Sequence, residues 1–107
     1  MTKYRLLYLV LLLIVWLNNS TPVITKPILQ NTEDCAALLR EARDFYIQGR
    51  YTEELEQYQR ALFCYREIDS QQGEWTTLNR IGLFYYDMGK YELSLIYYKQ
   101  ALSNSRR

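Results

Sequence analysis

Apolar residues follow two different patterns along the chain. Residues 6–17 form one unbroken apolar run. Beyond residue 34, apolar positions recur three and four residues apart, as Leu78, Ile81 and Tyr85 do, which is the spacing of one face of an α-helix. No Pro follows Pro27 to interrupt such helices. The pattern predicts an all-α domain, with helices near residues 34–48, 52–68, 72–88 and 92–104, the first of them capped by Asn31 or Thr32.

The N-terminal run has the form of an export signal. Lys3 and Arg5 precede about a dozen apolar residues, as is typical of signal peptides. The run is shorter than the roughly 20 apolar residues of a membrane-spanning helix. The polar residues 18–22 after it are expected to end any helix.

We therefore expect residues 1–25 to be a signal peptide, with cleavage after the weak site 23–25, and residues 26–33 to be a linker. Cleavage would leave the domain outside the cytoplasm, in the periplasm or secreted. The alternative is that residues 6–17 remain as an uncleaved membrane anchor.

An internal repeat organises the rest of the chain. The triplet Gly49-Arg50-Tyr51 returns forty residues later as Gly89-Lys90-Tyr91. Aligning residues 35–67 with 75–107 gives further identities, and repetition over this length indicates stacked helical or mixed units. The identical pairs are Leu38/Leu78, Arg40/Arg80, Tyr46/Tyr86, Gly49/Gly89, Tyr51/Tyr91, Leu55/Leu95, Tyr58/Tyr98, Ala61/Ala101, Leu62/Leu102 and Arg66/Arg106.

The second copy resembles the tetratricopeptide repeat family. The residues that carry the resemblance are Leu78, Ile81, Gly82, Tyr85, Gly89, Tyr91, Ser94, Tyr98 and Ala101. The first copy departs at Glu41, where the family usually has Leu, and at Glu54, where it has a small residue. Both departures suit an outermost repeat that faces solvent. The forty-residue period is similar to the long-repeat type found in bacterial exported arrays.

The resemblance implies two stacked antiparallel helix hairpins, a TPR-like α-solenoid, after the signal segment. The first repeat would cover residues 34–68, a connector 69–74 and the second repeat 75–107. Gly49 and Gly89 would end the first helix of each hairpin, and Gly82 would allow a close helix approach. The core face of the return helices is expected to hold Tyr51, Leu55, Tyr58 and Leu62 in the first copy and Tyr91, Leu95, Tyr98 and Leu102 in the second.

Composition narrows the possible functions. Lys and Arg number 13 against 12 Asp and Glu, without the basic excess that nucleic acid requires. The chain has no His and only two Cys, which argues against a metal site, a cofactor or a catalytic nucleophile with its base. The charge run at Glu53, Glu54 and Glu56 is interpreted as a solvated helix face. The eleven Tyr are attributed mainly to core packing. We expect no enzyme.

The leading hypothesis is therefore a protein-binding module. In the family that the chain resembles, the first helix of each hairpin lines a concave surface that holds partner segments. Ordinary half-exposed residues are the alternative interpretation of that face. Arg40, Arg43, Asn79 and Arg80 supply only part of the carboxylate clamp that some family members use. The partner-binding residues that this face predicts are Leu39, Arg43, Tyr46, Asn79, Leu83 and Tyr86.

The last helix suggests a further contact. Leu93, Ile96 and Tyr97 are expected to point away from its core face, where the first copy has polar residues. Self-association or further repeats would cover them. A second hypothesis makes this chain the N-terminal repeat portion of a larger exported protein with a caspase-like peptidase or other effector domain.

The two cysteines are candidates for a disulfide. Cys35 begins the first predicted helix, and Cys64 lies near the end of the second, each about the same distance from the turn at Gly49. Folding the hairpin brings these ends together, and an exported protein meets an oxidising compartment. Two unrelated buried thiols are the competing interpretation.

Overall fold

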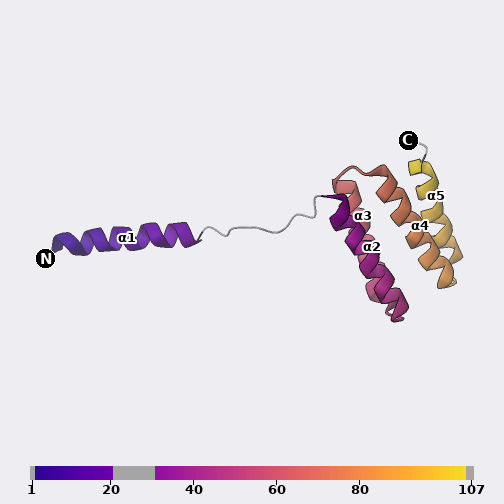
Figure 1. Cartoon of the computed structure of the whole chain (residues 1–107), viewed down its shortest axis with the longest axis horizontal. Coiled ribbons are helices and arrows are strands. Elements are labelled where there is room, and N and C mark those ends of the chain that lie inside the picture. The colour runs from indigo at the N-terminus through magenta and orange to yellow at the C-terminus, as the bar shows by residue number, and fades with distance from the viewer. Residues whose placement is uncertain (1, 21–30, 106–107) are drawn as a thin grey trace.

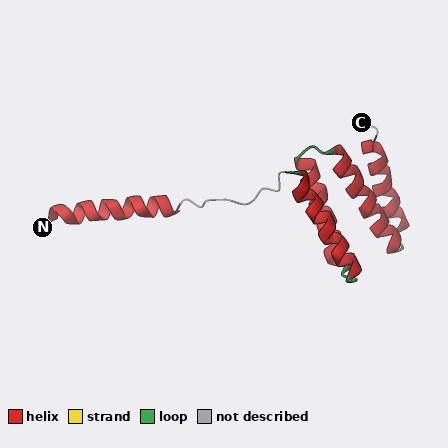
Figure 2. Ribbon diagram, in the orientation of Figure 1, coloured by secondary structure: helices red, strands yellow, loops and turns green. Residues whose placement is uncertain are grey.

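The described part of the chain is entirely helical. The computed structural model describes residues 2–20 and 31–105 (Figure 1). Short turns join the last four helices (Figure 2), and the described residues contain no strand, which confirms the all-α class. The helices are α1 (Thr2–Ser20), α2 (Thr32–Ile47), α3 (Tyr51–Glu67), α4 (Gln71–Asp87) and α5 (Tyr91–Ser105).

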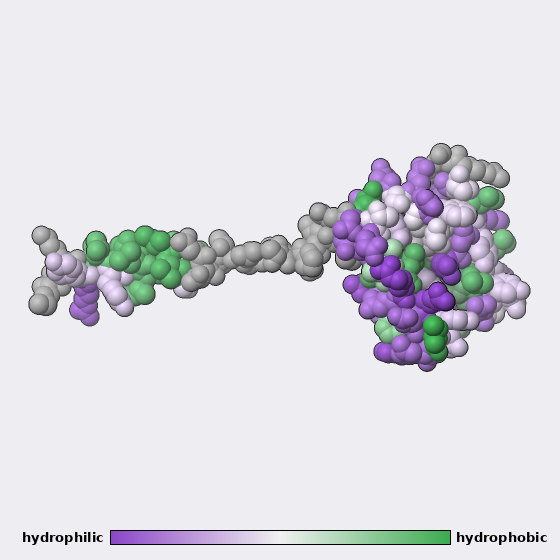
Figure 3. Space-filling model, viewed as in Figure 1, coloured by the Kyte–Doolittle hydropathy of each residue, from purple (hydrophilic) through white to green (hydrophobic). Residues whose placement is uncertain are grey.

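The first helix lies outside the packed domain. It makes no contact with α2, α3, α4 or α5, and the side chains of its apolar run are about half exposed or more. Apolar surface dominates it in Figure 3, whereas the visible face of the domain is mainly polar. None of the described helices combines the length and the apolar character that crossing a membrane requires.

The end of α1 differs from the expectation. Asn18 and Asn19 are helical, because polar residues such as Asn cost a helix only about 0.7 kcal/mol or less each. The expected cleavage site at 23–25 and most of the expected linker lie outside the described residues.

The domain helices begin and end at local signals in the sequence. Asn31 caps α2, its side-chain Oδ1 accepting a hydrogen bond from the Asp34 N–H at 2.8 Å. Ser70 caps α4 in the same way, with its Oγ accepting from the Gly73 N–H. The helix therefore starts at Gln71, and most of the connector expected at 69–74 is its first turn.

The three turns of the domain share one geometry. Gly49 and Gly89 have φ of +71° and +74°, as expected at the end of a helix. Asp69 takes the same place after α3 with φ of +58°, a conformation that a non-glycine residue adopts less easily. In each turn the residue after this position donates its N–H to a carbonyl five residues back, as Ser70 does to Tyr65.

Two hairpins stack to form the core. The α2–α3 hairpin packs on the α4–α5 hairpin through the contact between α3 and α4, with α2 also touching α4 (Figure 1). The ring of Tyr98 lies where a Cβ on Gly82 would be 2.9 Å away, so the close approach predicted at Gly82 is present. One buried cluster joins both hairpins: Ala42, Tyr58, Leu62, Leu78, Ile81, Phe84 and Ala101.

The predicted core face of α5 is wrong in part. Leu62 of α3 is only 8% exposed because α4 covers it, but its counterpart Leu102 is 52% exposed and Leu95 is 54% exposed. No described helix lies beyond α5 to cover them. Tyr51 and Tyr91 are also exposed, since they stand at the first residue of their helices.

The outward face predicted on α5 also needs correction. Leu93 and Ile96 are exposed, as expected. Tyr97 instead packs against the core of its own domain, stacked on Tyr85 with ring centroids 5.4 Å apart. The exposed apolar face of α5 therefore centres on Leu95 and Leu102 rather than on Tyr97.

Candidate partner-binding groove

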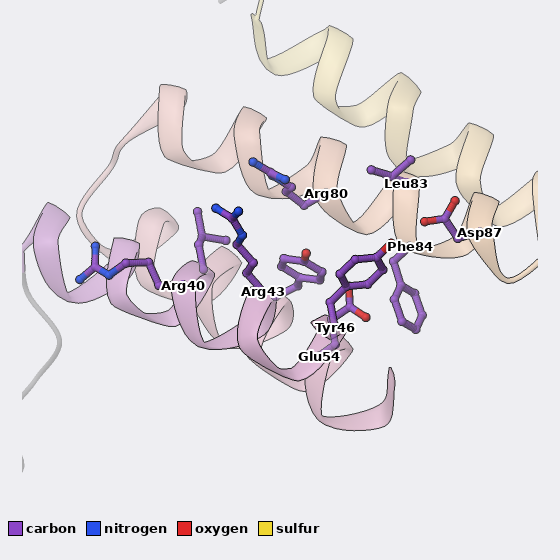
Figure 4. A pocket seen from close by; sticks show the side chains of 10 residues that line it. Arg40, Arg43, Tyr46, Glu54, Arg80, Leu83, Phe84 and Asp87 are labelled. Carbon is purple, nitrogen blue, oxygen red and sulfur yellow. The ribbon is translucent and has the colours of Figure 1, made fainter. Parts of the chain in front are cut away.

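A groove runs between the first helices of the two hairpins. Side chains of α2 and α4 form its walls, and two residues of α3 form its floor (Figure 4). It encloses a cavity of about 550 Å³ and is open to solvent. Its lining residues are Leu39, Arg40, Arg43 and Tyr46 from α2, Glu54 and Tyr58 from α3, and Arg80, Leu83, Phe84 and Asp87 from α4.

The structure gathers four of the six predicted partner-binding residues around this cavity. Leu39, Arg43, Tyr46 and Leu83 line it, and Tyr46 is 53% exposed. The other two, Asn79 and Tyr86, are not among the lining residues.

Tyr86 stands in the last turn of α4, where its ring packs edge-on against a residue of α5. That residue is Tyr91, and the ring centroids are 5.3 Å apart. Helical spacing alone could not place this ring, because its position depends on the α5 residue that follows the turn.

Charge is divided along the groove. Arg40, Arg43 and Arg80 lie towards one end, while Glu54 and Asp87 lie towards the other (Figure 4). Arg40 forms an exposed ion pair with Glu33. Arg43 and Arg80 form no ion pair with any residue that the structure describes, so their guanidinium groups are available to a ligand.

Glu54 was not expected at this site. Its side chain is only 4% exposed, so its assignment to a solvated face is wrong, although Glu56 of the same run is exposed. Burial raises the pKa of the Glu54 carboxyl. A hydrogen bond with the Tyr58 hydroxyl lowers this pKa, and the negative charge of Asp87 raises it. Burial likewise raises the pKa of Tyr58 to about 12, with the Glu54 charge contributing.

The structure agrees with the family resemblance of the sequence. It contains two stacked helical hairpins of similar geometry, with a groove between their first helices. A family model described as a tetratricopeptide repeat matches residues 76–107. Residues 76–107 form a tetratricopeptide repeat. Such repeats generally mediate protein–protein interaction and are typically non-catalytic. The first hairpin lies outside the matched residues, and only its geometry is similar to that of the second.

The comparisons go no further. Neither the search of curated proteins nor the search of solved structures found a match. The forty-residue repeat type stays a prediction from the internal alignment.

The two cysteines lie away from the groove. Cys35 at the start of α2 and Cys64 near the end of α3 form a disulfide, with their Cα atoms 5.5 Å apart. Both are buried, in a cluster with Leu38, Ala61 and Tyr65. The disulfide therefore joins the open ends of the first hairpin, opposite its turn.

The described residues around the groove contain no metal-binding cluster. Within residues 2–20 and 31–105, no group of three or more Cys, Asp or Glu side chains is placed to hold a metal ion. The groove has a basic end, an acidic end and apolar walls.

Proposed function

We propose that this protein binds a peptide segment of a partner protein in the groove between α2 and α4. The observation that carries the proposal is the open cavity, whose volume of about 550 Å³ suits several side chains of an extended segment. Exposed apolar groups such as Tyr46 and Leu83 line it beside Arg43 and Arg80, which form no ion pair with the described residues. These are the groups that commonly anchor a partner segment.

A peptide selected from a random library displayed on phage provides the test. Binding of that peptide to the full chain is measured by calorimetry, and Tyr46→Ala is expected to weaken it by about 2 kcal/mol, which is roughly 30-fold. Phe63→Ala is the matched control, because Phe63 is an aromatic residue of α3 that is 66% exposed and does not line the groove. Equal affinity of the wild type and Tyr46→Ala would show that the groove is not the binding site.

We also propose that the protein is exported, with residues 1–25 as a cleaved signal peptide. The Cys35–Cys64 disulfide supports this proposal, since such bonds form and persist in oxidising compartments. Fractionation of expressing cells should place the protein outside the cytoplasm, and N-terminal sequencing should begin near Lys26. A soluble cytoplasmic protein that begins at Met1 contradicts export.

A further proposal concerns the exposed apolar face of α5. We infer that a second chain or a further repeat covers Leu95 and Leu102, because their counterparts in the first hairpin are packed against α4. The double variant with Leu95→Ser and Leu102→Ser should sediment more slowly than the wild type in sedimentation velocity, because it no longer self-associates. A wild-type chain that is already monomeric argues against self-association. The hypothesis of a further effector domain stays a prediction.

A further inference from the structure

Glu54 has no cationic partner among the residues that the structure describes, and only the Tyr58 hydroxyl acts as a hydrogen-bond partner of its carboxyl group. Its Oε2 atom is buried without a hydrogen bond, the only side-chain atom of this kind in the part of the chain that the structure describes. Burying a carboxylate away from water is costly unless hydrogen bonds or an opposite charge replace the lost hydration. The neighbouring charge is Asp87, which has the same sign and makes ionisation of Glu54 harder still.

The fold itself does not require an acid at this position. The equivalent residue in the second repeat is Ser94, which is 2% exposed and occupies the same place at the start of the return helix. A serine there avoids the cost of a buried carboxylate. The repeat therefore does not require a carboxylate at this position, and the carboxylate of Glu54 stands at the floor of the groove.

No cation of the described chain compensates this carboxylate. Arg43 and Arg80 line the same groove, but neither forms an ion pair with Glu54 or Asp87. Figure 4 shows the arginines towards one end of the cavity and Glu54 and Asp87 at the other. The acidic end of the groove is thus left without a positive charge.

We propose that Glu54 and Asp87 form a subsite for the cationic head of a basic side chain carried by the partner segment. This inference rests on the proposed peptide-binding function of the groove. The ammonium or guanidinium group would supply the opposite charge and the hydrogen bonds that the buried Glu54 oxygen lacks. Tyr46, at the same end of the groove, offers an aromatic face for the cation.

A ligand reaches the subsite only if a side chain that lines the groove moves, and Tyr46 has the freedom to do so. The Oε2 atom of Glu54 is shielded from water, and Tyr46 is more than half exposed, so its side chain has room to rotate away from the floor. A long, flexible side chain such as Lys can then lay its aliphatic stem along Leu83 and place its head between the two carboxylates.

The subsite can be tested with n-butylammonium, which reproduces the end of a lysine side chain. Amide resonances of the full chain are followed by NMR during its addition, with n-butanol as the neutral control. Saturable shifts near Tyr46, Glu54 and Asp87 are expected with the ammonium alone. Glu54→Gln should weaken binding at least tenfold and Asp87→Asn severalfold.

Glu56→Gln is the matched control, because it removes the same charge from an exposed position of α3 and should leave binding unchanged. The subsite is overturned if n-butylammonium causes no saturable shift, if Glu54→Gln binds it as well as the wild type, or if Glu56→Gln loses binding to the same extent.

Phage-selected peptides separate this inference from the proposed function. Peptides selected on the wild-type chain should be enriched in Lys or Arg at one position, and the enrichment should vanish on Glu54→Gln while peptides are still retained. Retained peptides without a basic preference overturn the subsite and leave the groove function standing. If no peptide is retained, the groove function fails, and the n-butylammonium titration still decides the subsite.

Discussion

Removing the Cys35–Cys64 disulfide should cost this small domain much of its stability. The two cysteines are 29 residues apart, and closing a loop of that length reduces the conformational entropy of the unfolded chain. The chain-entropy relation gives about 3.6 kcal/mol at 25 °C for such a loop. A typical domain has only about 5–15 kcal/mol of total stability. A loss of this size lowers the midpoint of thermal unfolding by roughly 15–30 °C in a domain of about 60–100 residues.

The assay is thermal unfolding followed by near-ultraviolet circular dichroism, which reports the packing of the tyrosines. The oxidised full chain is compared with the same protein after full reduction, checked by titrating two free thiols. The variant with Cys35→Ala and Cys64→Ala is the control, because reductant should not change its midpoint. Equal midpoints for the oxidised and fully reduced wild type would refute the reasoning.

Further predictions concern single positions. Gly73→Ala should destabilise the domain by about 1–2 kcal/mol despite the better helix propensity of Ala, since the new Cβ would lie 2.0 Å from the buried ring of Tyr65, and chemical denaturation measures the loss. Asp69→Gly should stabilise by about 0.5–1 kcal/mol in the same assay, because Gly accepts a φ of +58° without steric cost; an unchanged midpoint contradicts the strain. Glu54→Gln should gain stability relative to the wild type as pH rises from 4 to 7. The pKa of Glu54 is raised in the folded state by burial, so the wild type loses stability as the carboxyl ionises; a difference that does not change with pH contradicts this.

Most of the fold could be predicted because its signals are local. The four domain helices could be predicted to within about two residues of their observed ends. The signals were helical periodicity, the absence of Pro after Pro27, and the glycines at 49 and 89. The cap at Asn31 and the close approach at Gly82 follow from single residue types. The repeat then indicates that the second hairpin copies the first.

Burial was harder to predict, because it depends on what lies beyond each helix. Leu62 and Leu102 occupy the same repeat position, yet only Leu62 has another helix against it. Alignment of the two copies assumes equal neighbours, so it placed Leu102 in the core. Tyr97 was predicted to point outwards because its counterpart Gln57 is polar, but Gln57 is itself buried, and Tyr85 of the preceding helix supplies a ring on which Tyr97 stacks.

The groove shows a different limit of sequence analysis. The residues of α2 and α4 that line it could be named in part from helical spacing, but its floor belongs to the start of α3. The signal for Glu54 was present, because the family usually has a small residue there and the second copy has Ser94. The neighbouring Glu53 and Glu56 made the position resemble an ordinary charged surface.

The two ends of the stack differ in polarity, and this difference limits how copies of the domain can associate. On α4, the face against α3 is buried, whereas the same repeat positions of α2 are exposed, three of them acidic. These positions are Gly73, Thr77, Ile81 and Phe84 on α4, and Glu33, Ala37, Glu41 and Asp44 on α2. An acidic α2 is a poor cover for Leu95 and Leu102 of another copy, because the contact would bury carboxylates against apolar side chains without partners. Head-to-tail stacking of copies is therefore disfavoured, and a self-associating chain should pair the apolar faces of two α5 helices about a two-fold axis.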